Sequence, residues 1–142
     1  MAVYLSNGVS VTVDSVDLSS LVSAVTINRS FDELEITAMG DSGHRFTKGL
    51  EASSVTIDFF NDSDTAKTLQ KLNTIWGTSV TVVIKQTSSA VSASNPSYTM
   101  SCLINNTTPV NGSVGDISTQ SLTWNVSRLQ PHGGFKLTHQ KA

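Results

Sequence analysis

Apolar and polar residues alternate in several short runs along this chain, which is the pattern of β-strands with one buried face. The runs share a predominance of Val and Ile and lie at residues 9–13, 25–27, 34–36, 55–59, 80–84, 98–104 and 122–126. Turn-forming residues separate them. The pattern predicts six or seven short strands distributed over most of the chain.

One segment has helical spacing instead. Between residues 64 and 76, apolar side chains recur every three or four positions, at Ala66, Leu69, Leu72 and Trp76. Polar residues suited to an N-cap come just before this segment, and Gly77 follows its end. We expect one amphipathic helix of about three turns, whose apolar side packs on a sheet. Trp76 and Trp124 both have patterned apolar neighbours, and we expect them in the core.

Two segments interrupt the periodic pattern. Residues 39–49 contain three glycines and are expected to form a long loop. Residues 128–142 contain Pro131 and a pair of glycines without periodicity. A chain of 142 residues is about one domain long. We therefore predict a mainly β, single-domain fold over residues 1–127, a β-sandwich or partly closed barrel with one flanking α-helix, followed by a C-terminal tail over residues 128–142.

The composition excludes several classes of protein. Charged residues make up 14% of the chain, while Ser and Thr together number 39 and Asn nine. The average globular protein is about 25% charged, so this chain is kept in solution by hydroxyls and amides. A net charge of -2 gives no basic surface for gripping a nucleic-acid backbone. No apolar run is long enough to span a membrane, and the single Cys102 rules out an internal disulfide framework.

Catalytic chemistry has only one weak candidate. Residues 40–43 read Gly-Asp-Ser-Gly and precede His44, which suggests the nucleophile loop of a chymotrypsin-like protease. The chain is too short for the two barrels of such an enzyme, and the other histidines, His132 and His139, lie in the irregular tail. We interpret the motif as a turn. The histidines lack metal-ligand spacing, so we predict no catalytic, cofactor-binding or metal-binding residues and no enzymatic activity.

The two irregular segments carry the candidate interaction residues. The loop contains charged and aromatic residues in close succession, and the tail keeps apolar residues although it lacks a pattern that would place it in the core. We expect contacts with neighbouring subunits from Arg45, Phe46, Lys48, Phe135 and Leu137. The alternative for the tail is a frayed terminus.

About residues 10 to 126 resemble the major tail tube proteins of long-tailed, siphovirus-type phages of actinobacteria. The most specific elements are the AMGD turn at Ala38–Asp41, the SASNPSY element at Ser92–Tyr98 and the GSVGD turn at Gly112–Asp116. Their order and spacing carry the resemblance, and the tail after Arg128 departs from it.

The resemblance implies a structural virion protein. Its subunits would form rings, usually hexameric, that stack into a tube through which phage DNA passes without specific binding. The implied partners are further copies of the chain, a tape-measure protein and tail-end proteins. The first residues lack the basic and long apolar regions of a secretion signal, so we expect synthesis in the host bacterial cytoplasm and incorporation into the virion tail.

A conduit for DNA needs a wall that does not retain phosphates. Asp32, Glu33 and Glu35 cluster on one predicted strand, and we assign them to the lumen, with a merely solvated strand face as the alternative. Two other functions stay open. The first is another virion component, namely a capsid decoration, tail terminator or tail-tip protein. The second is a secreted adhesive or carbohydrate-binding β-sandwich, which would need aromatic residues on an exposed face.

Overall fold

Nine strands and one α-helix make up the regular structure of the residues that the computed structural model describes, which are 8–65, 67–87, 89–92 and 95–132. The strands are β1 (Ser10–Val13), β2 (Val16–Asp17), β3 (Val22–Asn28), β4 (Phe31–Glu35), β5 (Phe46–Glu51), β6 (Ser54–Phe60), β7 (Ser79–Lys85), β8 (Ser97–Leu103) and β9 (Thr119–His132). The helix is α1 (Thr68–Ile75), and a short 3-10 helix spans Ser19–Leu21.

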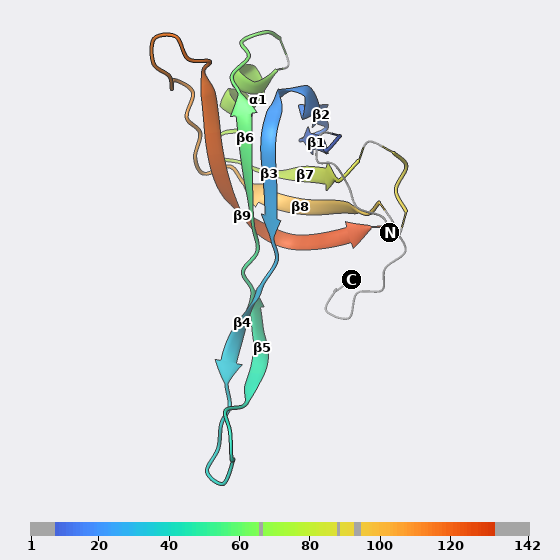
Figure 1. The fold of residues 1–142 in the computed structure, drawn as a ribbon, viewed down its shortest axis with the longest axis vertical. Coiled ribbons are helices and arrows are strands. Elements are labelled where there is room, and N and C mark those ends of the chain that lie inside the picture. The colour runs from blue at the N-terminus through green and yellow to red at the C-terminus, as the bar shows by residue number, and fades with distance from the viewer. Residues whose placement is uncertain (1–7, 66, 88, 93–94, 133–142) are drawn as a thin grey trace.

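Seven of these strands form one antiparallel sheet in the order β2-β1-β7-β8-β9-β6-β3. The long strand β9 joins its two parts, because its first half pairs with β6 and its second half with β8. The register with β8 shifts near Arg128, which has a φ of 60°. Strand β9 bends between its β6-paired and β8-paired halves (Figure 1). A bulge of this kind strengthens the local twist. The sheet curls into a half-barrel, which confirms the predicted mainly β fold in its partly closed form.

The core fills the concave side of this half-barrel. Alternate residues of the central strands are buried, as the sequence pattern predicted, and they include Val55, Ile57, Phe59, Val82, Met100, Cys102, Leu122 and Trp124. Trp124 is fully buried, lies 6.3 Å from the Phe59 ring, and donates its Nε1–H to the Asn106 carbonyl at 3.2 Å. Burial of the Cys102 thiol raises its pKa to about 12, which keeps the thiol in its unreactive protonated form.

The helix is shorter than predicted. It begins at Thr68 rather than near residue 64, because Asp62 accepts a hydrogen bond from the Asp64 backbone at 2.9 Å and so forms a separate turn before the helix. Leu72 and Ile75 are buried. The prediction that Trp76 lies in the core is wrong. The chain leaves helical geometry at this residue, and its side chain is 62% exposed.

The predicted loop over residues 39–49 is mostly the end of a hairpin. Strand β5 begins at Phe46 and pairs with β4, so Phe46 and Lys48 belong to a strand. Apolar and polar residues do not alternate along β5, because two residues of this strand oppose Asp32 at a bulge that contains Gly49. A Cβ at Gly49 would lie 3.0 Å from the Asp32 carbonyl oxygen. The bulge therefore explains both the glycine and the missing pattern.

Strand β9 also extends further than the sequence indicated. It continues to His132, and Leu129 is buried, so residues 128–132 belong to the sheet rather than to an irregular tail. The bulge at Arg128 puts two residues instead of one between buried Val126 and buried Leu129, which breaks the period of two. Phe135 and Leu137 lie outside the described residues.

Candidate functional site

The β4–β5 hairpin projects away from the half-barrel (Figure 1). Its two strands pair with each other and not with the larger sheet, and every residue of β4 is exposed. Several large apolar side chains are exposed on it, namely Phe31, Leu34, Ile36, Met39, Phe46 and Leu50. An isolated two-stranded hairpin is at best marginally stable in water. Apolar side chains gathered on such an element indicate an interaction site.

The hairpin brings some of the predicted site residues together on one face. Glu33 lies opposite Lys48, and Glu35 lies opposite Phe46. The Lys48 ammonium lies 4.9 Å from the centre of the Phe31 ring, within the range of a cation–π contact. The residues assigned to subunit contacts and two of those assigned to the lumen therefore share a surface.

Asp32 is on the opposite face. Its Cβ and the Leu34 Cγ both lie 3.1 Å from the position that a Cβ on Gly49 would occupy, which places Asp32 and Leu34 on the same side of the hairpin. The three carboxylates predicted to line one wall are therefore split between two faces. Sequence proximity suggested a single cluster, but side chains alternate along a strand.

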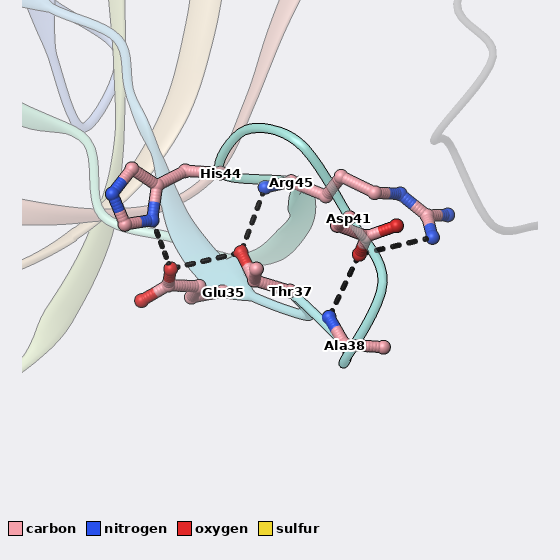
Figure 2. Close-up of polar contacts among 6 residues, drawn as sticks. All are labelled: Glu35, Thr37, Ala38, Asp41, His44 and Arg45. Carbon is pink, nitrogen blue, oxygen red and sulfur yellow. Dashed lines mark hydrogen bonds and ion pairs between the residues drawn. The ribbon is translucent and has the colours of Figure 1, made fainter.

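The end of the hairpin is organised by polar contacts (Figure 2). His44 Nδ1 lies 2.6 Å from Glu35 Oε2, and the Thr37 hydroxyl donates to the same oxygen at 2.9 Å. The Thr37 hydroxyl oxygen also accepts from the Arg45 backbone at 2.9 Å. The hydrogen bond from His44, followed by that from Thr37, lowers the pKa of Glu35 below its ordinary value of 4.5. These bonds hold the two strands together beyond their last paired residues.

The turn at this end spans Ala38–Asp41, so the Gly-Asp-Ser-Gly segment only begins within it. The Asp41 backbone donates to the Ala38 carbonyl at 3.1 Å, and the Asp41 carboxylate accepts from the Ala38 backbone at 2.7 Å. Gly40 has a φ of 95°, a conformation that glycine adopts without strain. Arg45 approaches the Asp41 carboxylate at 3.7 Å (Figure 2). His44 faces Glu35 across the hairpin.

A second exposed apolar region lies at the other end of the molecule, beside α1. Sequence reasoning missed it because Trp76 continues the helical pattern. A groove of about 550 Å³ is lined there by Asn73, Trp76, Asn105, Asn106, Thr107 and Pro109. The loop that continues from this groove exposes Val110, Val114 and Ile117.

The unclosed side of the half-barrel forms a larger groove. Its volume is about 720 Å³, and its lining includes Val22, Val25 and Ile27 of β3 together with Ile84 and Tyr98 from the facing strands. The Arg29 guanidinium lies 5.5 Å from the centre of the Tyr98 ring. Strands β3 and β2 end the described sheet on its two sides, so each offers backbone groups to another strand.

The outer face of the sheet explains where many of the hydroxyl residues lie. Ser121, Thr123, Asn125 and Ser127 of β9 are exposed, and Thr123 hydrogen-bonds Thr56 of β6 through their hydroxyls at 3.0 Å. This surface has little charge. Among the described residues, no three His, Cys, Asp or Glu side chains group as metal ligands would, and no helix is long and apolar enough to cross a membrane.

Comparison with known proteins gives matches in structure only. No protein-family model matches the chain, and a search of curated proteins gives no significant match. A chain of the SPP1 tail tube superposes with a TM-score of 0.72 at 12% identity, over 94% of this chain and 81% of that one. The chain has the fold of this tail tube protein.

Two further structures extend the comparison to a contractile injection system and a prophage baseplate. A chain of the sheath-tube complex of PVC, an extracellular contractile injection system, matches with a TM-score of 0.64 at 13% identity, over 92% of both chains. A chain of the baseplate of the anti-feeding prophage matches with a TM-score of 0.55 at 9% identity, over 94% of this chain and 98% of that one. The fold of this chain is therefore shared with chains of a tail tube, a sheath-tube complex and a baseplate.

Proposed function

We propose that this protein is the major tail tube subunit of a long-tailed actinobacteriophage. Its copies would close into rings, hexameric by the sequence resemblance, and the rings would stack into a conduit for phage DNA. The observation that carries this proposal is the match of nearly the whole chain to the SPP1 tail tube chain. It agrees with the resemblance of residues 10 to 126 to major tail tube proteins.

Ring closure requires that one surface of each subunit meet a different surface of the next. The sheet ends β2 and β3 are suited to this, since an exposed strand edge can pair with a strand of a neighbour. The groove on the open side of the half-barrel lies next to β3, so pairing there would also cover its apolar lining.

The hairpin is the proposed contact element between subunits. Phe46 would anchor it, with Arg45 and Lys48 at the border of the contact. The C-terminal segment would act as a second arm through Phe135 and Leu137. Glu33 and Glu35 remain the proposed acidic residues of the lumen. We do not propose Asp32 for the same wall, since it lies on the other face of the hairpin.

Further partners and the location follow from the same proposal. A tape-measure protein and tail-end proteins would contact the tube, DNA would pass without specific binding, and the protein would reside in the virion after synthesis in the bacterial cytoplasm. The protein would act as a structural component rather than as an enzyme.

One alternative has an observation in its favour. The match to a chain of the anti-feeding prophage baseplate is consistent with a ring at the end of a tail, which would form closed rings without extending into a tube. The two functions therefore differ in whether rings stack without limit.

Negative-stain electron microscopy of the purified protein at high concentration separates these functions. The tube proposal predicts long tubes of stacked rings. Single rings or short stacks that do not lengthen with concentration would support the tail-end alternative, and protein that stays monomeric throughout would contradict both.

A further inference from the structure

Trp76 is placed unlike the other tryptophan of the chain. Trp124 is fully buried, whereas Trp76 is 62% exposed at the end of α1. Tryptophan is the residue most enriched among side chains that dominate binding between proteins. Because its neighbours in the groove are Asn, Thr and Pro, an occupant of this groove would meet one large ring among uncharged polar groups.

The chemistry of the groove limits what can fill it. No charged side chain lines it, so a partner that placed an unpaired charge there would lose hydration without compensation. A suitable partner presents apolar atoms and polar backbone, with its own charges already paired.

The end of the β4–β5 hairpin has these properties. Met39 is fully exposed at its turn. The nearby Asp41 carboxylate is bound by the Ala38 backbone and approached by Arg45, and Glu35 is bound by His44 and Thr37. The charges next to Met39 are therefore largely matched within the hairpin itself.

The two features lie at opposite ends of the long axis of the molecule, with α1 at the top and the hairpin at the bottom (Figure 1). A copy displaced along this axis brings its hairpin toward the α1 end of the next copy. Such a contact joins two different surfaces and repeats without closing, which builds a filament.

We propose that the end of the hairpin, through Met39, occupies the Trp76 groove of a copy in the adjacent ring. The flexible thioether of Met39 would pack on the Trp76 indole, a favourable sulfur–aromatic contact. This inference rests on the proposed tube function. It adds to that function the surface that the hairpin of one copy contacts, which is the Trp76 groove at the α1 end of the next copy.

Disulfide trapping in assembled tubes tests the contact directly. In the double variant Met39→Cys with Asn105→Cys, oxidation should link successive copies into a ladder of dimers, trimers and higher species on a non-reducing gel. The native Cys102 is buried with a pKa of about 12, so it does not compete. The matched control is Met39→Cys with Asn125→Cys, because Asn125 is exposed on β9 away from the groove. Tubes in which the first pair gives no more ladder than the control would overturn the proposal.

Tryptophan fluorescence gives a second, independent measurement. Assembly should shift the Trp76 emission toward the blue, and Trp76→Phe should remove that shift while Trp124 still reports the folded core. Trp76→Ser should leave the subunit folded and raise the concentration needed for tube growth by roughly tenfold, or about 1.4 kcal/mol.

The outcomes distinguish the two proposals. Tubes of wild-type protein with an unchanged Trp76 spectrum contradict this contact and leave the tube function intact. A blue shift without the Met39–Asn105 ladder means that another segment or another protein fills the groove, which also contradicts it. Wild-type protein that forms neither rings nor tubes contradicts the tube function itself.

Discussion

Gly49 illustrates how a single position constrains the hairpin. It lies in the β5 bulge, where a side chain would meet the backbone and Cβ of Asp32 and the Leu34 side chain at 3.0 to 3.1 Å. Contacts this short force either the backbone or the neighbouring side chain to move. The bulge in turn determines which residues of β5 share a face with Glu33 and Glu35.

We therefore expect Gly49→Val to distort the hairpin while the half-barrel stays folded. Tube assembly should require at least about tenfold more protein, equivalent to about 1.4 kcal/mol, as measured by sedimentation of tubes over a concentration series. Gly43→Val is the matched control, because a Cβ there has open space. Equal assembly of the two variants would show that the bulge does not shape the contact surface.

The Glu35–His44 pair gives a prediction about pH. Since hydrogen bonds from His44 and Thr37 lower the pKa of Glu35 below 4.5, the ionised carboxylate is favoured by the folded hairpin. The stabilisation is present above the unfolded pKa and is lost as the pH falls through the lower folded value.

NMR titration of the Glu35 carboxyl checks this directly. His44→Ala should raise the Glu35 pKa toward 4.5, and Thr37→Val should raise it by less, because the His44 bond has the larger effect. A Glu35 pKa that does not respond to His44→Ala contradicts the arrangement in Figure 2.

At the scale of elements, α1 has a buried side and an exposed end. Leu72 is on the buried side of the helix, while Trp76 follows the last helical residue and is largely exposed. In the unassembled subunit, Leu72→Ala should cost about 2–5 kcal/mol of unfolding free energy. Trp76→Ala should cost no more than about 0.5 kcal/mol, as is usual for surface positions. Urea denaturation at a concentration below assembly measures both, and a larger loss for Trp76→Ala would place that residue in the core after all.

The elements that the sequence predicted well are those with one buried face. The strands around Ile57, Val82 and Trp124 bury alternate residues, so burial leaves a period of two in the sequence. Strand β5 has no buried face and contains a bulge. Its sequence, FTKGLE, therefore has no alternating pattern that would have predicted a strand paired with β4. For β9, the bulge at Arg128 interrupted an otherwise regular pattern.

The candidate site was predicted in part for the same reason. Arg45, Phe46 and Lys48 were assigned to the candidate site because aromatic and charged residues stand together in a segment without a core pattern. The α1 groove was missed, because Trp76 has the spacing of a buried residue and only the backbone turn after Ile75 exposes it. Helical spacing would place Trp76 on the buried side only if the helix included it, and α1 ends at Ile75.

At the scale of the whole molecule, the scarcity of charge fits a protein that buries several surfaces against copies of itself. Hydroxyls and amides are less costly to remove from water than charges. A wall with few cations also offers little for DNA to bind.

The lumen assignment can be tested on assembled tubes. Glu33→Lys with Glu35→Lys should make tubes retain labelled duplex DNA at low salt and release it as salt increases, because lysines in the wall would bind phosphates through counterion release. Glu33→Gln with Glu35→Gln is the control for loss of the acids alone and should not retain DNA. If the lysine tubes retain none, these two residues do not face the lumen.

The direct connection of the hairpin strands to two strands of the half-barrel has a mechanical consequence. Strand β3 leads directly into β4 and β5 leads into β6, and the Ala52 backbone donates to the Ser30 carbonyl at 2.8 Å where they meet. A pull on the end of the hairpin along the long axis therefore enters β3 and β6 parallel to their direction. Ladder hydrogen bonds in an antiparallel sheet lie perpendicular to the strands, so this load shears the bonds between β6 and β9 together instead of opening them one at a time. A subunit held by its hairpin therefore resists stretching with the full length of its β6–β9 ladder.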